Sequence, residues 1–378
     1  MRSLSTNSTR SRWQWTSASL AVILLVSWWM YSARESEIDS KSLTEWFEDY
    51  SNWTSPTGLH TSRCYQVFIE LEGDALPFLI NLAQTKQTSL DRAYESLVRR
   101  LPAYCSQRMP QPRSDSWHLS RLNTALRLIG IIGGQQRWKA DEGEPSRKPG
   151  IQLALPAIHA AMQIDATRSS AAHAAWFIGP PASVLVPELI EMAAHPDDRG
   201  ALAALQAFAL MGSSASNAVP LLMQISTNES GSRQIHAVQS LGGIGAPAFL
   251  SVPVIASLLD TTNPVLRLTA ARALAELGVT PESAVSALLA MRRGTNEWAA
   301  RVAALALWNR DRKDEELRME IISTLRSDQR GWMASCLRSL GTNARPFADE
   351  LRRLSNDSNE VWRAQAKVAL RRIQIPPL

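Results

Sequence analysis

Glycines that recur with a fixed spacing constrain the fold of this chain more than any other feature. Four apolar, helix-like runs each end in a glycine, and these glycines are 33 residues apart: Gly179, Gly212, Gly245 and Gly278. Gly341 ends a similar run 63 residues after Gly278, which leaves room for one more unit, with Asn309 in place of the glycine. Periods of this length are typical of arrays in which each repeat is one small structural unit.

Prolines repeat with nearly the same period. They are the second residues of the strings LPAI, VPEL, VPLL and VPVI, namely Pro156, Pro187, Pro220 and Pro253. Proline is best tolerated in the first turn of a helix, where the missing N–H has no partner to lose. Glycine after a helix suits a left-handed C-cap. Each unit is therefore predicted to be helix A, a short turn, helix B and a glycine stop.

The helix B strings have the spacing of an amphipathic helix. In VLRLTAARALAELG (265–278) apolar residues recur every three or four positions, and the alanines allow close approach of neighbouring helices. One such hairpin cannot bury its apolar face alone, whereas stacked hairpins share a continuous core. The chain has 378 residues, more than one compact core usually accommodates. We therefore predict an all-α protein whose residues 151–378 form an α–α superhelix.

Two units carry a more specific pattern. One has Asp260, then Val265-Leu266-Arg267 and ALAELG, and the other has Asp357, then Val361-Trp362-Arg363 and AQAKVAL. This order resembles the HEAT repeat, with its proline in helix A, an Asp before helix B, and Val-Arg ahead of an alanine-rich run. The resemblance implies that Asp260, Arg267, Asp357 and Arg363 tie adjacent units together. Ala201 and Gln234 take the arginine position in two units, so an unbroken ladder is not expected.

The resemblance weakens towards the N-terminus. Residues 73–134 are predicted to be divergent helical repeats, with a helix A at 73–83 containing Pro77 and B-type helices at 88–104 and 119–133. The polar stretch 135–150 contains glycine and proline and is predicted to be a loop insertion. Residues 34–72 are predicted to be a membrane-proximal linker with one short helix. Ser42 and Glu45 fit a capping box there, ahead of an apolar stripe from Leu43 to Tyr50.

An uncharged stretch near the N-terminus predicts a single transmembrane signal-anchor helix. Residues 13–33 carry no charge and, at about 1.5 Å per residue, can cross a hydrocarbon core of about 30 Å. Arginines precede this stretch in the tail 1–12 and acids follow it, so the tail is predicted to be cytoplasmic and the body extracytoplasmic. The alternative is a cleaved signal peptide, but cleavage after Ala33 would place Tyr31 where a small residue is needed. The alanine-rich repeats are similar to bacterial HEAT proteins, so the outer compartment would be the periplasm.

The three cysteines are Cys64, Cys105 and Cys336, and no Cys/His metal spacing is present. In an extracytoplasmic body, Cys64 and Cys105 are a candidate disulfide. The alternative is three unpaired thiols, mostly buried.

A column of polar residues stands six positions before the repeat glycines. It consists of His173, Gln206, Gln239, Arg272 and Ser335, and Ala303 interrupts it. Because B helices line the concave face of a HEAT solenoid, this column is a candidate partner-binding ridge; the alternative is an ordinary solvated face. Three tryptophans near the starts of successive B helices (Trp298, Trp332 and Trp362) are expected to pack along one edge or, alternatively, to form an aromatic patch for a partner.

No motif for catalysis, cofactor binding or metal binding is present, so no such residues are assigned. We therefore predict a non-enzymatic, membrane-tethered scaffold that binds a protein or peptide. One alternative is nucleic-acid binding by the arginine-rich surface from Arg292 to Arg372, although acids are interleaved with those arginines. Another is a HEAT-type lyase or modification factor, which rests on fold analogy alone. The identity of the partner stays open.

Overall fold

The computed structural model describes residues 38–52, 62–101, 103–106, 109–110, 112–142 and 150–374. The regular secondary structure of these residues is helical, with a single isolated bridge between Ile38 and Lys41 in place of any strand. The prediction of an all-α protein is confirmed for this part of the chain. The chain divides into two compact units, Met1–Val67 and Phe68–Leu378.

The predicted tail 1–12 and anchor 13–33 lie outside the described residues. Within the described ranges, no helix combines the length and the apolar character that a membrane crossing requires.

In the first unit, helix α2 (Leu43–Ser51) begins at the predicted capping box. The Glu45 backbone N–H donates to Ser42 Oγ at 3.3 Å, and the Ser42 N–H donates to Glu45 Oε2 at 2.7 Å. The predicted apolar stripe of this helix is buried: Leu43, Trp46, Phe47 and Tyr50. Helix α3 (Arg63–Leu71) begins in the same unit.

The second unit starts with four helices that precede the regular array. They are α4 (Leu76–Gln84), α5 (Ser89–Arg100), α6 (Ala103–Ser106) and the long α7 (Asp115–Glu142). Helix α4, with Pro77 in its first turn, packs against α7. The prediction of a loop from residue 135 is wrong for residues 135–142, which continue α7. The first glycine or proline after Gly134 is Gly143, so nothing in the backbone stops the helix earlier.

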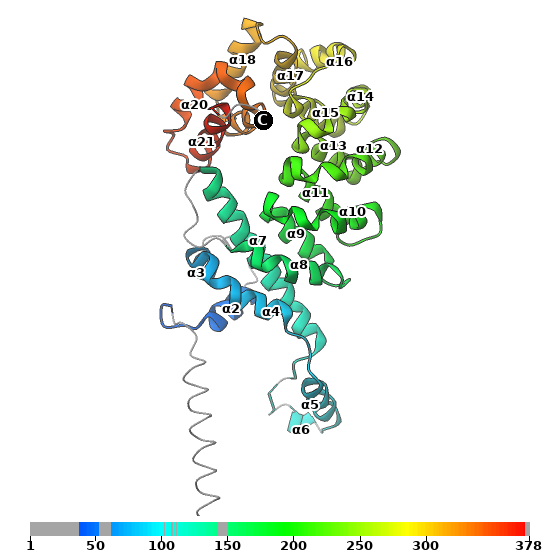
Figure 1. The fold of residues 1–378 in the computed structure, drawn as a ribbon, viewed down its shortest axis with the longest axis vertical. Helices are drawn as coiled ribbons and strands as arrows, with labels where there is room; N and C mark the ends of the chain where they lie inside the picture. The colour runs from blue at the N-terminus through cyan, green and yellow to red at the C-terminus, as the bar shows by residue number, and fades with distance from the viewer. Residues whose placement is uncertain are drawn as a thin grey trace, which may run out of the picture. The chain divides into compact units, whose positions relative to one another are not determined.

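The regular array consists of A and B helices in two layers (Figure 1). The A helices are α8 (Leu155–Met162), α10 (Val186–Ala194), α12 (Val219–Asn228), α14 (Val252–Ser257), α16 (Glu282–Arg292), α18 (Glu315–Leu325) and α20 (Ala348–Leu354). The B helices are α9 (Arg168–Ile178), α11 (Ala201–Met211), α13 (Ser232–Ile244), α15 (Pro264–Leu277), α17 (Glu297–Arg310), α19 (Arg330–Ser339) and α21 (Glu360–Gln374). This alternation confirms the predicted hairpin repeats.

Contacts between B-type helices run in a closed circuit. They pass from α7 through α9, α11 and α13 to α15, and α15 contacts both α17 and α19. Helix α19 contacts α21, and α21 in turn contacts α7 (Figure 1). The last hairpin therefore packs against the helix that precedes the first regular one.

The four repeat prolines lie in the first turns of α8, α10, α12 and α14, as predicted. The repeat glycines all have positive φ. Among Gly179, Gly212, Gly245 and Gly278, only Gly278 has the predicted left-handed conformation (φ 71°, ψ 20°). Gly245 instead has φ 78° and ψ −140°, and Gly179 and Gly212 are similar. The reason is the next segment: after these three glycines the chain enters a 3₁₀ turn that leads directly into helix A.

Asn309, which replaces a glycine in the repeat pattern, is a helical residue of α17 with a buried side chain. Its Nδ2 donates to the Ala275 carbonyl of α15 at 2.9 Å. The α17 residues from Val302 to Asn309 are all buried. This hairpin therefore gains a side-chain link to its neighbour where the others have a turn.

Candidate partner-binding surface on the B helices

The polar column predicted from the repeats lies on helices that touch one another. His173, Gln206, Gln239, Arg272 and Ser335 belong to α9, α11, α13, α15 and α19, and each of these helices contacts the next. His173 is exposed and the other four are half-buried. We call this set the polar row. Ala303, which interrupts it in sequence, is buried in α17, and α15 contacts α19 directly.

Hydrogen bonds extend the polar row to residues that sequence reasoning missed. Gln206 Nε2 lies 3.4 Å from His236 Nε2 on the neighbouring helix, and His236 Nδ1 is buried without a hydrogen-bond partner among the described residues. Arg272 Nε donates to Glu276 at 2.8 Å. His236 and Glu276 lie three and four positions from a member of the row, a spacing that places residues on one helix face and is the signal that finds them.

The predicted tryptophan edge is a packed stack. The rings of Trp298 and Trp332 have centroids 4.2 Å apart, and the Arg330 guanidinium lies 3.9 Å from the centroid of Trp362. All three indoles are half-buried. The stack therefore joins α17, α19 and α21 and favours packing over an open aromatic patch.

Two ion pairs of one kind connect successive hairpins near the starts of their B helices. Arg168 Nη1 lies 2.6 Å from Asp198 Oδ2, and Arg330 Nε lies 3.1 Å from Asp357 Oδ2. In each, an arginine at the start of one B helix reaches the aspartate before the next B helix. Arg363 instead donates to the Asp357 carbonyl of its own hairpin at 2.9 Å.

The inter-repeat role expected for Asp260 and Arg267 is not found, since neither makes an ion pair with any described residue. The partner positions explain this. The turn before the B helix that follows Arg267 reads Gly294-Thr295-Asn296 and offers no acid. On the side before Asp260, Gln234 stands in the arginine position and donates to the Ser226 carbonyl of its own hairpin.

Most arginines of the C-terminal part are neutralised by acids. The pairs are Arg292 with Glu316 and Glu320, Arg301 with Glu297, Arg310 with Glu282, Arg318 with Glu315, Arg326 with Glu350, Arg330 with Asp357, Arg352 with Asp349, and Arg353 with Glu350. These acids reduce the positive charge that the surface offers to a phosphate backbone, while Arg293, Arg312 and Arg345 form no ion pair with a described residue.

The candidate disulfide is not formed in this structure. Cys64 is buried and its thiol donates to Ser62 Oγ at 3.3 Å, whereas Cys105 is exposed, and both thiols are free. Cys336 is also free, and burial raises the pKa of its thiol well above the ordinary value. Among the described residues, no three His, Cys, Asp or Glu side chains are grouped as a metal site.

Comparison with known proteins identifies the repeats. Residues 219–308, from the start of α12 into α17, match the model of the HEAT-repeat family. Residues 219–308 are therefore HEAT repeats. The HEAT match falls within the predicted array 151–378 and includes the unit with Asp260 and Arg267.

Two solved structures are similar to this chain. One is an engineered protein, 19% identical, covering 75% of this chain and 96% of its own, with a TM-score of 0.31. The other is YibA of Escherichia coli, 14% identical, covering 77% of this chain and 99% of its own, with a TM-score of 0.37. No curated protein matches the chain.

Proposed function

We propose that this chain is a membrane-tethered, non-catalytic HEAT-repeat scaffold that binds a protein or peptide along the polar row. The observation that supports this most is the continuity of the row. From His173 to Ser335, five B helices in mutual contact each contribute a polar side chain at one register. A partner laid across these helices would meet a hydrogen-bonding group on each of them.

The chemistry of the row suits a polypeptide. Gln206 and Gln239 each carry two N–H donors and a carbonyl acceptor, which match the backbone groups of an extended or helical segment. The buried Nδ1 of His236 lacks a hydrogen-bond partner among the described residues. Because that nitrogen is enclosed by the protein, the groups of the row that a partner can reach are the side-chain amides.

The tether rests on the sequence of residues 13–33, and the extracytoplasmic position of the body rests on the positive-inside rule. A topology reporter fused after Leu378 tests both. We expect activity of a reporter that works only outside the cytoplasm. Activity of a cytoplasmic reporter at the same position would contradict the proposed orientation.

Partner binding is tested by capture from membranes with the full chain in mild detergent. The test variant carries H173A, Q206A, Q239A and R272A. The matched control carries Q163A, Q224A, S257A and S286A; Gln163 follows helix α8 directly, and the other three are exposed polar residues of the A helices. We expect the control to retain the partners that the test variant loses, with both variants showing the wild-type circular dichroism spectrum. Equal recovery of every partner by the two variants would remove the polar row from the proposal.

The two other hypotheses gain less support. The ion pairs from Arg292 to Arg353 count against a nucleic-acid surface, and no feature of the described residues favours a lyase. Nucleic-acid binding would regain support if the chain bound duplex DNA with an affinity that fell steeply with salt.

A further inference from the structure

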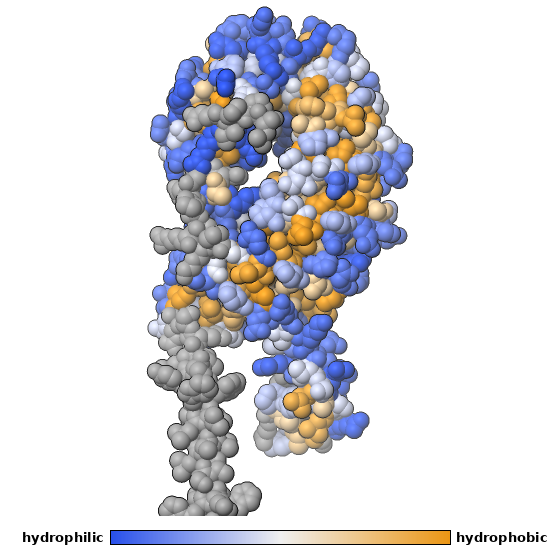
Figure 2. Space-filling view, viewed as in Figure 1, coloured by the Kyte–Doolittle hydropathy of each residue, from blue (hydrophilic) through white to orange (hydrophobic). Residues whose placement is uncertain are grey.

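Beyond the proposed scaffold, we propose that helices α5 and α6 bind an anionic lipid surface. Three large apolar side chains are exposed on these helices: Leu90 (80% exposed), Leu97 (53%) and Tyr104 (67%). In all of α5, only Val98 is buried. Figure 2 shows apolar residues gathered at this end of the second unit, with hydrophilic residues beside them.

The arrangement of side chains around α5 is that of an interfacial helix. Leu90 and Leu97 are seven positions apart, so they lie on one face two turns from each other. Arg100 borders this face, whereas Asp91 and Glu95 lie away from it. A strongly amphipathic helix of low average hydrophobicity, with leucines on one face and arginines around it, is typical of helices that lie in the headgroup region of a bilayer.

Local interactions occupy both acids of α5. The Asp91 carboxylate accepts from the Thr88 backbone N–H and hydroxyl at 2.9 and 2.7 Å, and completes the capping box. The Glu95 carboxylate pairs with Arg99 at 2.5 Å and accepts from Gln87 at 2.9 Å.

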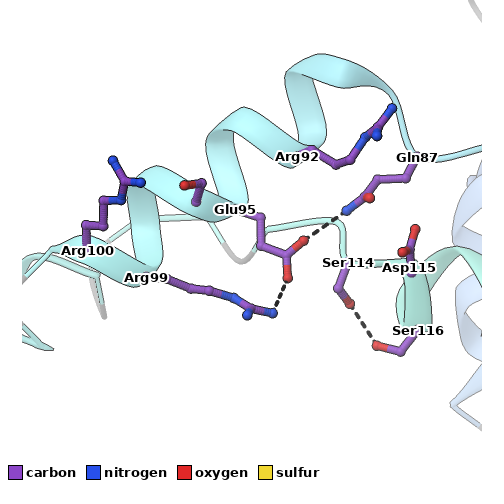
Figure 3. Close-up of a pocket in the computed structure, with 9 residues that line it drawn as sticks. Gln87, Arg92, Glu95, Arg99, Arg100, Ser114, Asp115 and Ser116 are labelled. Atoms are coloured by element: carbon purple, nitrogen blue, oxygen red, sulfur yellow. Dashed lines mark hydrogen bonds and ion pairs between the residues drawn. The ribbon is translucent and has the colours of Figure 1, made fainter.

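Three cations of the same segment are left without a partner acid. Lys86, Arg92 and Arg100 are exposed and make no ion pair with any described residue. Arg92 and Arg100 project from α5 on either side of Glu95, beside a polar cavity of about 640 Å³ that Ser114 and Ser116 also line (Figure 3).

These charges select the occupant. A protein partner that bound only Leu90 and Leu97 would not need unpaired cations around these residues. An anionic bilayer, in contrast, attracts each cation that lies within about a Debye length, roughly 10 Å. A helix is about as wide as that length, so Arg92 on the far side of α5 still contributes. Insertion of the apolar side chains and attraction of the cations to the charged surface then act together. A neutral bilayer lacks the second of these contributions.

The exposed Cys105 of α6 gives a direct readout, because Cys64 and Cys336 are buried. The full chain is labelled on Cys105 with an environment-sensitive fluorophore. It is then mixed with vesicles of phosphatidylcholine, or of phosphatidylcholine and phosphatidylglycerol in equal parts. We expect the probe to brighten, and to be quenched by brominated acyl chains, only with phosphatidylglycerol and less at high salt. The probe reports only on the surroundings of α6, so its response does not depend on the predicted anchor. Flotation of the same sample measures binding of the whole chain to the vesicles, to which the predicted anchor contributes.

Two variants and two controls complete the test. L90S/L97S and R92S/R100S are each expected to lower the probe response roughly tenfold at limiting lipid. L153S/L250S and R293S/R345S remove exposed side chains of the same kinds elsewhere and are expected to respond like the wild type. An equal response to neutral vesicles, no response to either vesicle, or a wild-type response from both test variants would overturn the proposal. If neither vesicle gives a response, Leu90 and Leu97 are assigned to binding a protein partner instead.

Discussion

The guanidinium of Arg330 lies 3.9 Å from the centroid of the Trp362 ring while its Nε lies 3.1 Å from Asp357 Oδ2. Arg330 belongs to α19, and both of its partners belong to the next hairpin. One side chain therefore holds two repeats together by charge and by stacking. The pair is partly shielded from water, with side-chain exposures of 25% for Arg330 and 14% for Asp357, so solvent weakens it less than it weakens a surface pair.

Replacing Arg330 should loosen the C-terminal hairpin. We expect R330A to lower the free energy of unfolding by about 2 kcal/mol, because it removes a cation–π contact and a charge-assisted hydrogen bond together. R330K should recover only part of this loss, since an ammonium keeps the charge but not the planar stacking. Urea unfolding followed by circular dichroism measures the difference. Equal stability of the lysine variant and the wild type would show that stacking contributes nothing.

Two glycines of α7 should respond to alanine in opposite directions. A Cβ on Gly130 would lie 2.9 Å from the Ala174 Cα, which is backbone and cannot move aside. We expect G130A to destabilise the protein by about 1–3 kcal/mol through overpacking. A Cβ on Gly134 would meet nothing closer than 3.4 Å, so G134A should stabilise by up to about 1 kcal/mol through helix propensity. Thermal unfolding midpoints that shift in the same direction would contradict this assignment.

The repeat glycines should differ in their tolerance of asparagine. Gly278 has a left-handed conformation that asparagine adopts readily, so G278N should cost less than about 1 kcal/mol. Gly245 has φ 78° and ψ −140°, a region almost restricted to glycine, and G245N should cost about 1–3 kcal/mol. A Cβ on Gly245 has no atom within 4 Å, so the cost of G245N would come from the backbone alone. A Cβ on Gly278 would lie 3.3 Å from Leu340 Cδ2, the end of a flexible side chain that can shift at small cost. Urea midpoints of the two variants, measured side by side, check this order.

Glu350 should make stability depend on pH. A hydrogen bond from Arg326, supported by Arg353, lowers the pKa of the Glu350 carboxyl below its ordinary 4.5. The folded pKa lies below the unfolded one, so this stabilisation is complete at neutral pH and is lost as the pH falls through the folded pKa. We expect E350Q to be less stable than the wild type at neutral pH and equal to it in strong acid. D349N, which alters a solvent-exposed pair with Arg352, should change little at any pH.

The parts of the fold that the sequence predicts are those with a local cause. Gly278 and Pro253 mark helix ends because the backbone itself requires them there, and the hairpin period follows from such residues. The polar row also follows from register alone. The polar composition of residues 135–142 predicts a loop, but α7 continues through residue 142 because no helix-breaking residue follows Gly134 before Gly143.

Other features depend on which helices become neighbours. The ion pair of Arg168 with Asp198 joins residues of two hairpins. Within its own hairpin Arg168 does not differ from the unpaired Arg267, because the acid that decides the pairing stands in the next hairpin as Asp198 and has no counterpart after Arg267. The contact of α15 with α19 depends on how the buried helix α17 is packed, with Asn309 bonded to Ala275. Such relationships arise in tertiary packing and leave no periodic trace in the chain.

The contact between α21 and α7 has a consequence for how this protein can evolve. An open stack can gain or lose a repeat at its end at the cost of one interface. Here an added hairpin would displace α21 from α7, and a deleted one would remove the contact between α21 and α7. Duplication should therefore be tolerated poorly between residues 150 and 374, and length variation among related chains should fall in the turns, with the number of hairpins held constant.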